Sequence, residues 1–190
     1  MPGKIAGMDE GLIHQALDQA FATNETAPLV ELSRALYTCF MIGIDPDTNS
    51  PYLVTVKWLA AHLPNLKIID ASWYMSAQNR NCRAEFKTGH IPGAVFFDIE
   101  AIADQASDLP HMLPTPDEFA QALAKLGICD RDTIIVYDTA GLFSAARVWW
   151  SLTIMGARDV RVLQGGLPAW QQAGHKVDDH QEPIVATQFI

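Results

Sequence analysis

Cysteine and positive charge are both scarce in this sequence. Its three cysteines, Cys39, Cys82 and Cys129, form no CxxC pair, so neither a disulfide framework nor a zinc site is indicated. Sparse thiols are typical of a reducing compartment, and we expect a cytoplasmic protein. Lysine and arginine number 13 against 22 acids, which gives a net charge of −9. Nucleic acids and anionic membranes attract basic surfaces, so neither is an expected partner.

Long apolar runs are also missing. The longest apolar stretch, 29–44, contains Glu31 and Arg34, whereas a membrane-spanning helix needs about 20 apolar residues. Residues 1–30 contain one lysine and no arginine, unlike a transit peptide. The sequence therefore predicts neither a membrane span nor such a leader. With 49% hydrophobic residues, the chain can build the core of one globular domain.

Turn-forming residues divide the chain near residue 50. The segment 43–51, GIDPDTNSP, contains two prolines together with Asp and Asn residues that bond their own backbone. Before it, apolar periodicity predicts helices over 9–22 and 28–41. We therefore predict three parts: a helical N-terminal extension over 1–50, a main domain over 51–180, and a tail over 181–190 that resembles an interdomain linker.

Within the main domain, short apolar strands alternate with helical segments. Strands are expected at 66–72, 94–97, 133–138 and 160–166, with a short strand or turn before Thr55. Helices are expected at 55–63, 115–128, 144–156 and 167–174. Strands that are apolar on both faces are typical of a buried parallel sheet covered by helices. The pattern predicts an α/β domain.

The start of the helix at 115–128 has a specific local signature. Thr115 suits the cap position, Pro116 the first helical position, and Glu118 the reciprocal partner of the cap. In such a capping box, each side chain satisfies a backbone N–H group of the other residue. We expect a well-defined helix start at this point.

The loop after the strand at 133–138 has the position of a reactive site but no reactive side chain. The segment 134–150, IIVYDTAGLFSAARVWW, predicts a buried strand, a short loop and a helix that begins near Ser144. A loop between a parallel strand and a helix often presents a reactive group or binds an anion. This loop, DTAGLFS, contains no Cys, His or Lys. The loop therefore lacks an obvious nucleophile or base.

A set of motifs in a fixed order resembles the rhodanese family. After IIDASWY come GHIPGAVFFDIE (89–100), LPHMLPTPDEFA (109–120), VYD…FSAARVWW (136–150) and VLQGGLPAW (162–170). The resemblance covers about 52–180 and is closest to the N-terminal, non-catalytic half of tandem-domain sulfurtransferases of the thiosulfate and 3-mercaptopyruvate type. It implies a rhodanese-like three-layer domain with a mostly parallel, roughly five-stranded sheet flanked by helices. It also implies no cofactor.

In the catalytic domains that the family contains, a cysteine opens this loop and carries sulfur as a persulfide. An ungapped alignment from FSA puts the cysteine position at Thr139, and a one-residue slip puts it at Asp138 or Ala140. A threonine hydroxyl cannot carry a persulfide sulfur, and Asp138 would repel an anionic substrate if it pointed into the loop. The resemblance therefore implies an inactive domain whose partner is a C-terminal rhodanese domain. That partner would bind the small anionic sulfur donor.

The resemblance also indicates residues that could support the partner's cleft. In the mercaptopyruvate-type enzymes an acidic residue and a histidine lie near the cysteine of the partner domain, and here these positions are Glu100 and His111. An acid and a histidine can fix a tautomer and relay a proton, although glutamate stands where the family has aspartate. Arg147 could bond loop carbonyls or meet the partner. Structural roles remain open for all three, and Trp149, Trp150 and Trp170 are expected in the core.

Alternatives to this hypothesis depend on other features. Arg80 and Arg83 flank Cys82 and would favour its thiolate, so this thiol could replace the missing nucleophile. The chain could instead be a complete interaction module without a cysteine in this loop, which docks through residues 1–50. A phosphatase of the related dual-specificity type needs Cys and Arg at the two ends of the loop, and this sequence has neither there.

Overall fold

The computed structural model describes residue 45, residues 47–48 and residues 50–189. The helices expected over 9–22 and 28–41, and Cys39, lie outside the described residues. A compact unit begins at Asp45 and extends to the end of the chain.

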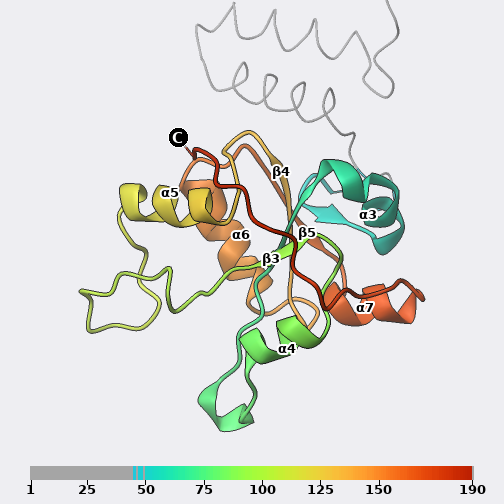
Figure 1. The fold of residues 1–190 in the computed structure, drawn as a ribbon, viewed down its shortest axis with the longest axis horizontal. Coiled ribbons are helices and arrows are strands. Elements are labelled where there is room, and N and C mark those ends of the chain that lie inside the picture. Colours follow the sequence, from blue (N-terminus) through green and yellow to red (C-terminus); the bar gives the residue numbers. More distant parts are fainter. Residues whose placement is uncertain (1–44, 46, 49, 190) are drawn as a thin grey trace, which may run out of the picture. The chain divides into compact units, whose positions relative to one another are not determined.

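A five-stranded parallel sheet forms the centre of this unit, in the order β1-β5-β4-β2-β3 (Figure 1). The strands are β1 (Leu53–Val54), β2 (Lys67–Asp70), β3 (Ala94–Phe96), β4 (Thr133–Tyr137) and β5 (Asp159–Leu163). All residues of β4 are buried, as expected for a strand covered by helices on both faces. The sheet confirms the predicted α/β fold class, and β3 forms one of its edges.

Helices cover both faces of the sheet (Figure 1). They are α3 (Val56–His62), α4 (Cys82–Thr88), α5 (Pro116–Lys125), α6 (Ala145–Ile154) and α7 (Gly166–Gln172), with short 3₁₀ turns at Leu63–Asn65 and Ser76–Gln78. On the face of α5 and α6, Phe119 and Leu152 pack against Val136 of the central strand. Trp170 is buried, as predicted, and Trp149 packs against this core.

Helix α5 begins where its capping residues predict. The Thr115 side chain accepts from the Glu118 N–H group, and Glu118 accepts from the Thr115 N–H and O–H groups. The helix ends at Lys125, earlier than the predicted 128. The reason is Gly127, which has a φ of +71°, so that the next N–H group bonds back to Leu123.

A pair of glycines brings α7 close to the loop after β4. Gly165 and Gly166 have φ values of +73° and +56°, a region that favours glycine. A Cβ atom on Gly166 would lie 2.1 Å from the Asp138 carbonyl oxygen, so only glycine allows this approach. The turn after β5 is therefore built against the loop after β4.

The C-terminal tail, which resembles a linker in sequence, packs on the domain. The Thr187 N–H group donates to Ala124 at 3.0 Å and its hydroxyl donates to Ile128 at 2.8 Å. The Phe189 ring is 7% exposed and meets Phe119 edge-on, with ring centres 6.3 Å apart. The tail thereby closes the core beside α5.

Candidate functional site

The loop after β4 is organised around the carboxylate of Asp138, which is 1% exposed. Its Oδ1 accepts from the N–H groups of Ala140 and Gly141, at 2.9 and 2.7 Å. Its Oδ2 accepts from the N–H groups of Phe143 and Ala145, at 2.6 and 2.9 Å. Backbone amides thus converge on one point, as they do in an anion site. The anion at that point is part of the chain itself.

The same carboxylate caps helix α6. The helix begins at Ala145, next to the predicted start near Ser144, and the Ser144 side chain makes no capping hydrogen bond. Its buried hydroxyl has no hydrogen-bond partner among the described residues. Asp138 instead accepts from Ala145, the first residue of α6. A negative charge at this end is favoured by the helix dipole, so Asp138 connects the loop to the helix start.

Thr139, at the position expected for the missing cysteine, belongs to a hydrogen-bond network. Its N–H group donates to Ser72 Oγ at 3.1 Å, and its Oγ1 lies 2.5 Å from the Tyr74 hydroxyl oxygen. Tyr74 donates to Glu85 at 2.6 Å, so the proton between Thr139 and Tyr74 comes from Thr139. Arg80 stacks on the Tyr74 ring at 3.8 Å and binds both oxygens of Glu85.

This network leaves Thr139 without an activating base. Burial, and next the hydrogen bond to Glu85, raises the pKa of Tyr74 to about 12. The phenol is therefore neutral at physiological pH, and its hydroxyl group donates a hydrogen bond to Glu85. The hydrogen bond from Arg80 holds the pKa of Glu85 below its usual value, against the effect of burial. The Thr139 hydroxyl accordingly has a neutral phenol as its partner.

A cavity of about 310 Å³ beside the loop is lined by both Cys82 and Thr139. The prediction that Arg80 and Arg83 favour the Cys82 thiolate is wrong. Each arginine pairs with a carboxylate instead, at 2.6 and 2.8 Å. Burial raises the pKa of the Cys82 thiol, and nearby carboxylates act in the same direction. Cys82 therefore lacks the thiolate character of a nucleophilic cysteine.

Asp70 lines the same cavity with a buried carboxylate. It accepts from the Ser72 N–H group at 2.8 Å and is hydrogen-bonded to the Tyr137 hydroxyl. Burial raises the pKa of Asp70, although these hydrogen bonds act against it. Burial also raises the pKa of Tyr137 well above its ordinary value, and Asp70 adds to this. The wall next to Thr139 thus contains an acid that resists ionisation.

Trp73 brings together the acid and the histidine predicted to support a cleft. The indole N–H group donates to Glu100 at 3.0 Å, and the His111 ring meets the indole edge-on, with ring centres 5.0 Å apart. Within the described part of the chain, no hydrogen bond joins Glu100 to His111 directly. His111 has a φ of +57°, uncommon for a residue with a side chain. Arg147 donates to the His111 carbonyl.

Large apolar side chains of the loop after β4 and of α6 are exposed to solvent. Leu142, Phe143 and Trp150 are 60, 50 and 41% exposed, so the prediction that Trp150 lies in the core is wrong. Trp150 faces solvent, with the Arg147 guanidinium 5.2 Å from its ring centre. Phe143 stacks on Trp73 with ring centres 6.3 Å apart. We refer to the following residues as the loop face: Trp73, Glu100, His111, Leu142, Phe143, Arg147 and Trp150.

Sequence reasoning did not identify Trp73 and Tyr74 as parts of the site. Both follow β2, which pairs in parallel with β4 so that Asp70 lies opposite Tyr137. The carboxyl ends of neighbouring parallel strands share one edge of the sheet, where sites form. The segment after β2 therefore had to meet the loop after β4, and its polar aromatic residues were the available signal.

Metal and membrane sites find no support among the described residues. In that part of the chain, no group of His, Cys, Asp or Glu side chains is arranged to hold a metal ion. No helix in the same part is long and apolar enough to cross a bilayer.

Comparison with known families identifies the fold. A family model described as a rhodanese-like domain matches residues 55–173. The chain belongs to the rhodanese family. Among solved rhodanese structures, SseA from Escherichia coli matches with a TM-score of 0.69 at 43% identity, covering 74% of this chain and 56% of that one. Tum1 from Saccharomyces cerevisiae matches with a TM-score of 0.64 at 29% identity, covering 73% and 48%.

Curated relatives of this rhodanese chain are sulfurtransferases. The Arabidopsis thaliana thiosulfate/3-mercaptopyruvate sulfurtransferase 1, mitochondrial, is 50% identical over 134 residues, which cover 70% of this chain and 35% of the relative. The 3-mercaptopyruvate sulfurtransferase of Escherichia coli K12 is 48% identical over 127 residues, covering 65% and 45%. This rhodanese chain is thus homologous to sulfurtransferases but spans less than half the length of these relatives.

Proposed function

We propose that this rhodanese domain is the non-catalytic N-terminal half of a sulfurtransferase of the thiosulfate or 3-mercaptopyruvate type. In this proposal a cysteine of a C-terminal rhodanese domain takes sulfane sulfur from a small anionic donor, holds it as a persulfide and passes it to an acceptor. The observation that carries the proposal is the Asp138 carboxylate at the centre of the loop.

The electrostatics of a persulfide explain why this observation matters. A persulfide is an anion, and a catalytic loop stabilises it with free backbone N–H groups at a helix start. Here the N–H groups of Ala140, Gly141, Phe143 and Ala145 already donate to Asp138. A second anion at the same point would meet an unscreened negative charge. The loop has no cysteine, and the four N–H groups that converge at its centre are already occupied.

The loop face supports the choice of partner. Phe143 and Trp150 expose large aromatic surfaces next to Arg147, and aromatic residues and arginine are enriched in protein interfaces. We propose that the catalytic domain covers this face, and that Glu100, His111 and Arg147 then support its cleft. The sparse free thiols suit a reducing compartment such as the cytoplasm.

Sulfur transfer to cyanide by the purified chain is the first test. We expect no thiocyanate from either thiosulfate or 3-mercaptopyruvate, because the described loop contains no thiol. Turnover by the chain alone would contradict the proposal, and its loss in Cys82→Ser would assign the chemistry to that thiol.

A chimera tests the support of the cleft. This chain replaces the matching part of the Escherichia coli 3-mercaptopyruvate sulfurtransferase, and kcat/KM is measured with 3-mercaptopyruvate. We expect Glu100→Gln and His111→Gln each to lower kcat/KM by about tenfold or more, whereas Val185→Ser, at a side chain that is 79% exposed outside the loop face, leaves it unchanged. A folded chimera that is inactive, or insensitive to both changes, would contradict this role.

The intact mass of the protein from its source separates the two candidate functions. A species much heavier than 20.9 kDa would support the tandem enzyme. A single species at 20.9 kDa would favour the interaction module without a loop cysteine.

A further inference from the structure

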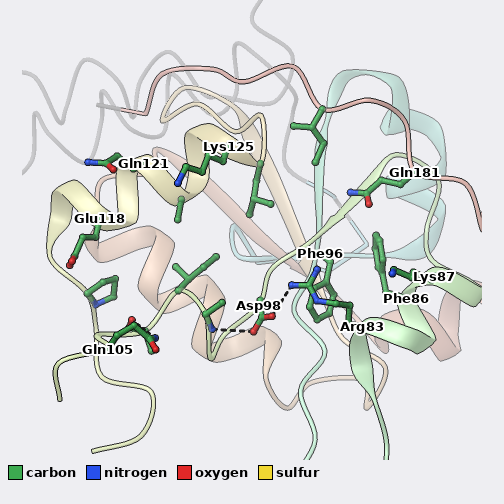
Figure 2. Close-up of a pocket in the computed structure, with 17 residues that line it drawn as sticks. Arg83, Phe86, Lys87, Phe96, Asp98, Gln105, Glu118, Gln121, Lys125 and Gln181 are labelled. Atoms are coloured by element: carbon green, nitrogen blue, oxygen red, sulfur yellow. Dashed lines mark hydrogen bonds and ion pairs between the residues drawn. The ribbon is translucent and has the colours of Figure 1, made fainter. Parts of the chain in front are cut away.

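A second hollow of the molecule lies away from the loop face. Between α4 and α5, beside the edge strand β3, is a cavity of about 570 Å³ (Figure 2). This volume is within the range of small-molecule sites. No residue of the loop face lines it. We call it the α4–α5 groove.

The floor of the groove is apolar and aromatic. Phe96 of β3 and Phe86 of α4 are 7 and 4% exposed, with ring centres 5.6 Å apart. The partly buried Ile102 and Leu126 also line it, together with Ile184 of the tail. Such a floor binds an apolar body by removing its surface from water.

Helix α5 supplies one wall through a single stripe of side chains. Glu118, Gln121, Ala122 and Lys125 line the groove, and their spacing places them on one side of the helix. Leu126, which directly follows the helix, continues this wall. The wall is about 12 Å long at 1.5 Å per residue. The wall therefore suits a ligand of one or two rings rather than a long chain.

The acids of the groove are already satisfied. Asp98 pairs with Arg83 at 2.8 Å and accepts from the Ala101 N–H group at 3.1 Å. Glu118 accepts from the N–H and O–H groups of Thr115 at the start of α5. The charge of Asp98 is thus balanced by Arg83, whereas Glu118 is held by neutral donors and keeps its negative charge.

The ionisable side chains that line the groove are Arg83, Lys87 and Lys125 against Asp98 and Glu118, an excess of positive charge. Lys87 of α4 and Lys125 of α5 approach the groove from opposite walls (Figure 2). Neither forms an ion pair within the described residues. On a chain with a net charge of −9, this local excess of positive charge attracts anions.

We propose that the α4–α5 groove binds a small amphipathic anion, with an aromatic or branched apolar body and one carboxylate or sulfonate group. The body packs on Phe96 and Phe86, and the acid group lies between Lys87 and Lys125. The site is independent of the loop face, so this proposal does not rest on the function proposed above.

The test uses two fluorescent probes that differ in charge. 8-Anilinonaphthalene-1-sulfonate has a sulfonate group on an aromatic ring system. N-phenyl-1-naphthylamine has a similar ring system without the sulfonate. Each is titrated into the 190-residue chain. We expect saturable binding of the sulfonate at one probe per chain, and weaker binding of the uncharged probe.

Charge variants identify the site. The double variant Lys87→Met, Lys125→Met should weaken sulfonate binding by about tenfold and leave the uncharged probe unaffected. Lys57→Met is the matched control, because this exposed lysine pairs with Asp47 and does not line the groove. Ala122→Trp should fill the groove and weaken both probes. Near-ultraviolet circular dichroism verifies that each variant is folded.

Several results would overturn the proposal. The first is that the sulfonate probe shows no saturable binding. The second is that Lys57→Met weakens sulfonate binding as much as the double lysine variant does. The third is that the affinity for the sulfonate is unchanged in both the double lysine variant and Ala122→Trp. Loss of binding in Phe143→Ser would place the probe on the loop face instead. Binding of an acidic tetrapeptide, with no binding of the sulfonate, would make the groove a peptide site and would also overturn it.

Discussion

At the scale of single residues, the geometry of the loop depends on Asp138. Its two oxygens accept hydrogen bonds from both halves of the loop, so the backbone from Ala140 to Ala145 wraps around the carboxylate. Hydrogen bonds to a charged acceptor are stronger than neutral ones. Buried donors that lose their acceptor are costly.

We expect Asp138→Asn to lower the free energy of unfolding by about 2–3 kcal/mol. The amide keeps one acceptor oxygen but turns an NH₂ group toward amides that now have no acceptor. Urea denaturation measures the change. Asp108→Asn is the control, since this exposed residue should change stability by less than about 0.5 kcal/mol. Equal effects of the two substitutions would contradict the described loop.

Asp70 predicts a pH dependence of stability. Its folded pKa lies above the ordinary value of 3.8 because of burial. Folding therefore favours the protonated form, whose stabilising contribution is present below that value and is lost as pH rises through the folded pKa. Asp70→Asn stays neutral, so its stability relative to the parent should increase between about pH 4 and pH 7.

Urea denaturation at several pH values checks this prediction, with Asp108→Asn as the control. Parallel stability curves for Asp70→Asn and the parent would mean that the Asp70 carboxylate is not perturbed by burial.

At the scale of elements, α5 shows what local sequence can and cannot specify. Its start was predictable because Thr115 and Glu118 form the capping box and Pro116 occupies the first helical position. Its end at Lys125 comes earlier than the predicted 128, although Gly127 is itself a local stop signal with a positive φ. The packing of this glycine against the tail could not be predicted from local sequence: a Cβ there would lie 2.9 Å from the Val185 carbonyl oxygen.

The capping box gives a direct prediction. Thr115→Ala removes the acceptor for the Glu118 N–H group and should cost about 1 kcal/mol of stability. Thr115→Ser retains the hydroxyl and should cost clearly less. Urea denaturation compares the two, and equal losses would show that the hydroxyl is not the stabilising group.

At the scale of the whole molecule, the tail contributes to the core. Phe189→Ala should lower the free energy of unfolding by about 3 kcal/mol, because it empties a buried site beside Phe119. Val185→Ala, at a side chain that is 79% exposed, should change it by less than about 0.5 kcal/mol. Thermal or urea denaturation of both variants measures the difference. A neutral Phe189→Ala would show that the tail does not pack in solution.

Periodicity and motif order predicted the α/β layers and the parallel sheet, since these depend on residues close together in sequence. They could not show that Asp138 points inward, that Trp73 lies between Glu100 and His111, or that Trp150 faces solvent. The position of Trp73 depends on segments that the pairing of β2 with β4 brings together, and the other two depend on the path of the loop and of α6 in the folded chain. The α4–α5 groove likewise forms only when two helices and the tail meet.

The Asp138 carboxylate is part of the chain and therefore has a high effective concentration at the loop amides. A dissolved anion that binds the same amides must compete with it. A cysteine introduced at position 139 alone would find those amides occupied. Removing the carboxylate alone would leave the amides free but supply no thiol. A thiol at position 139 and free amides in this loop therefore require two substitutions made together.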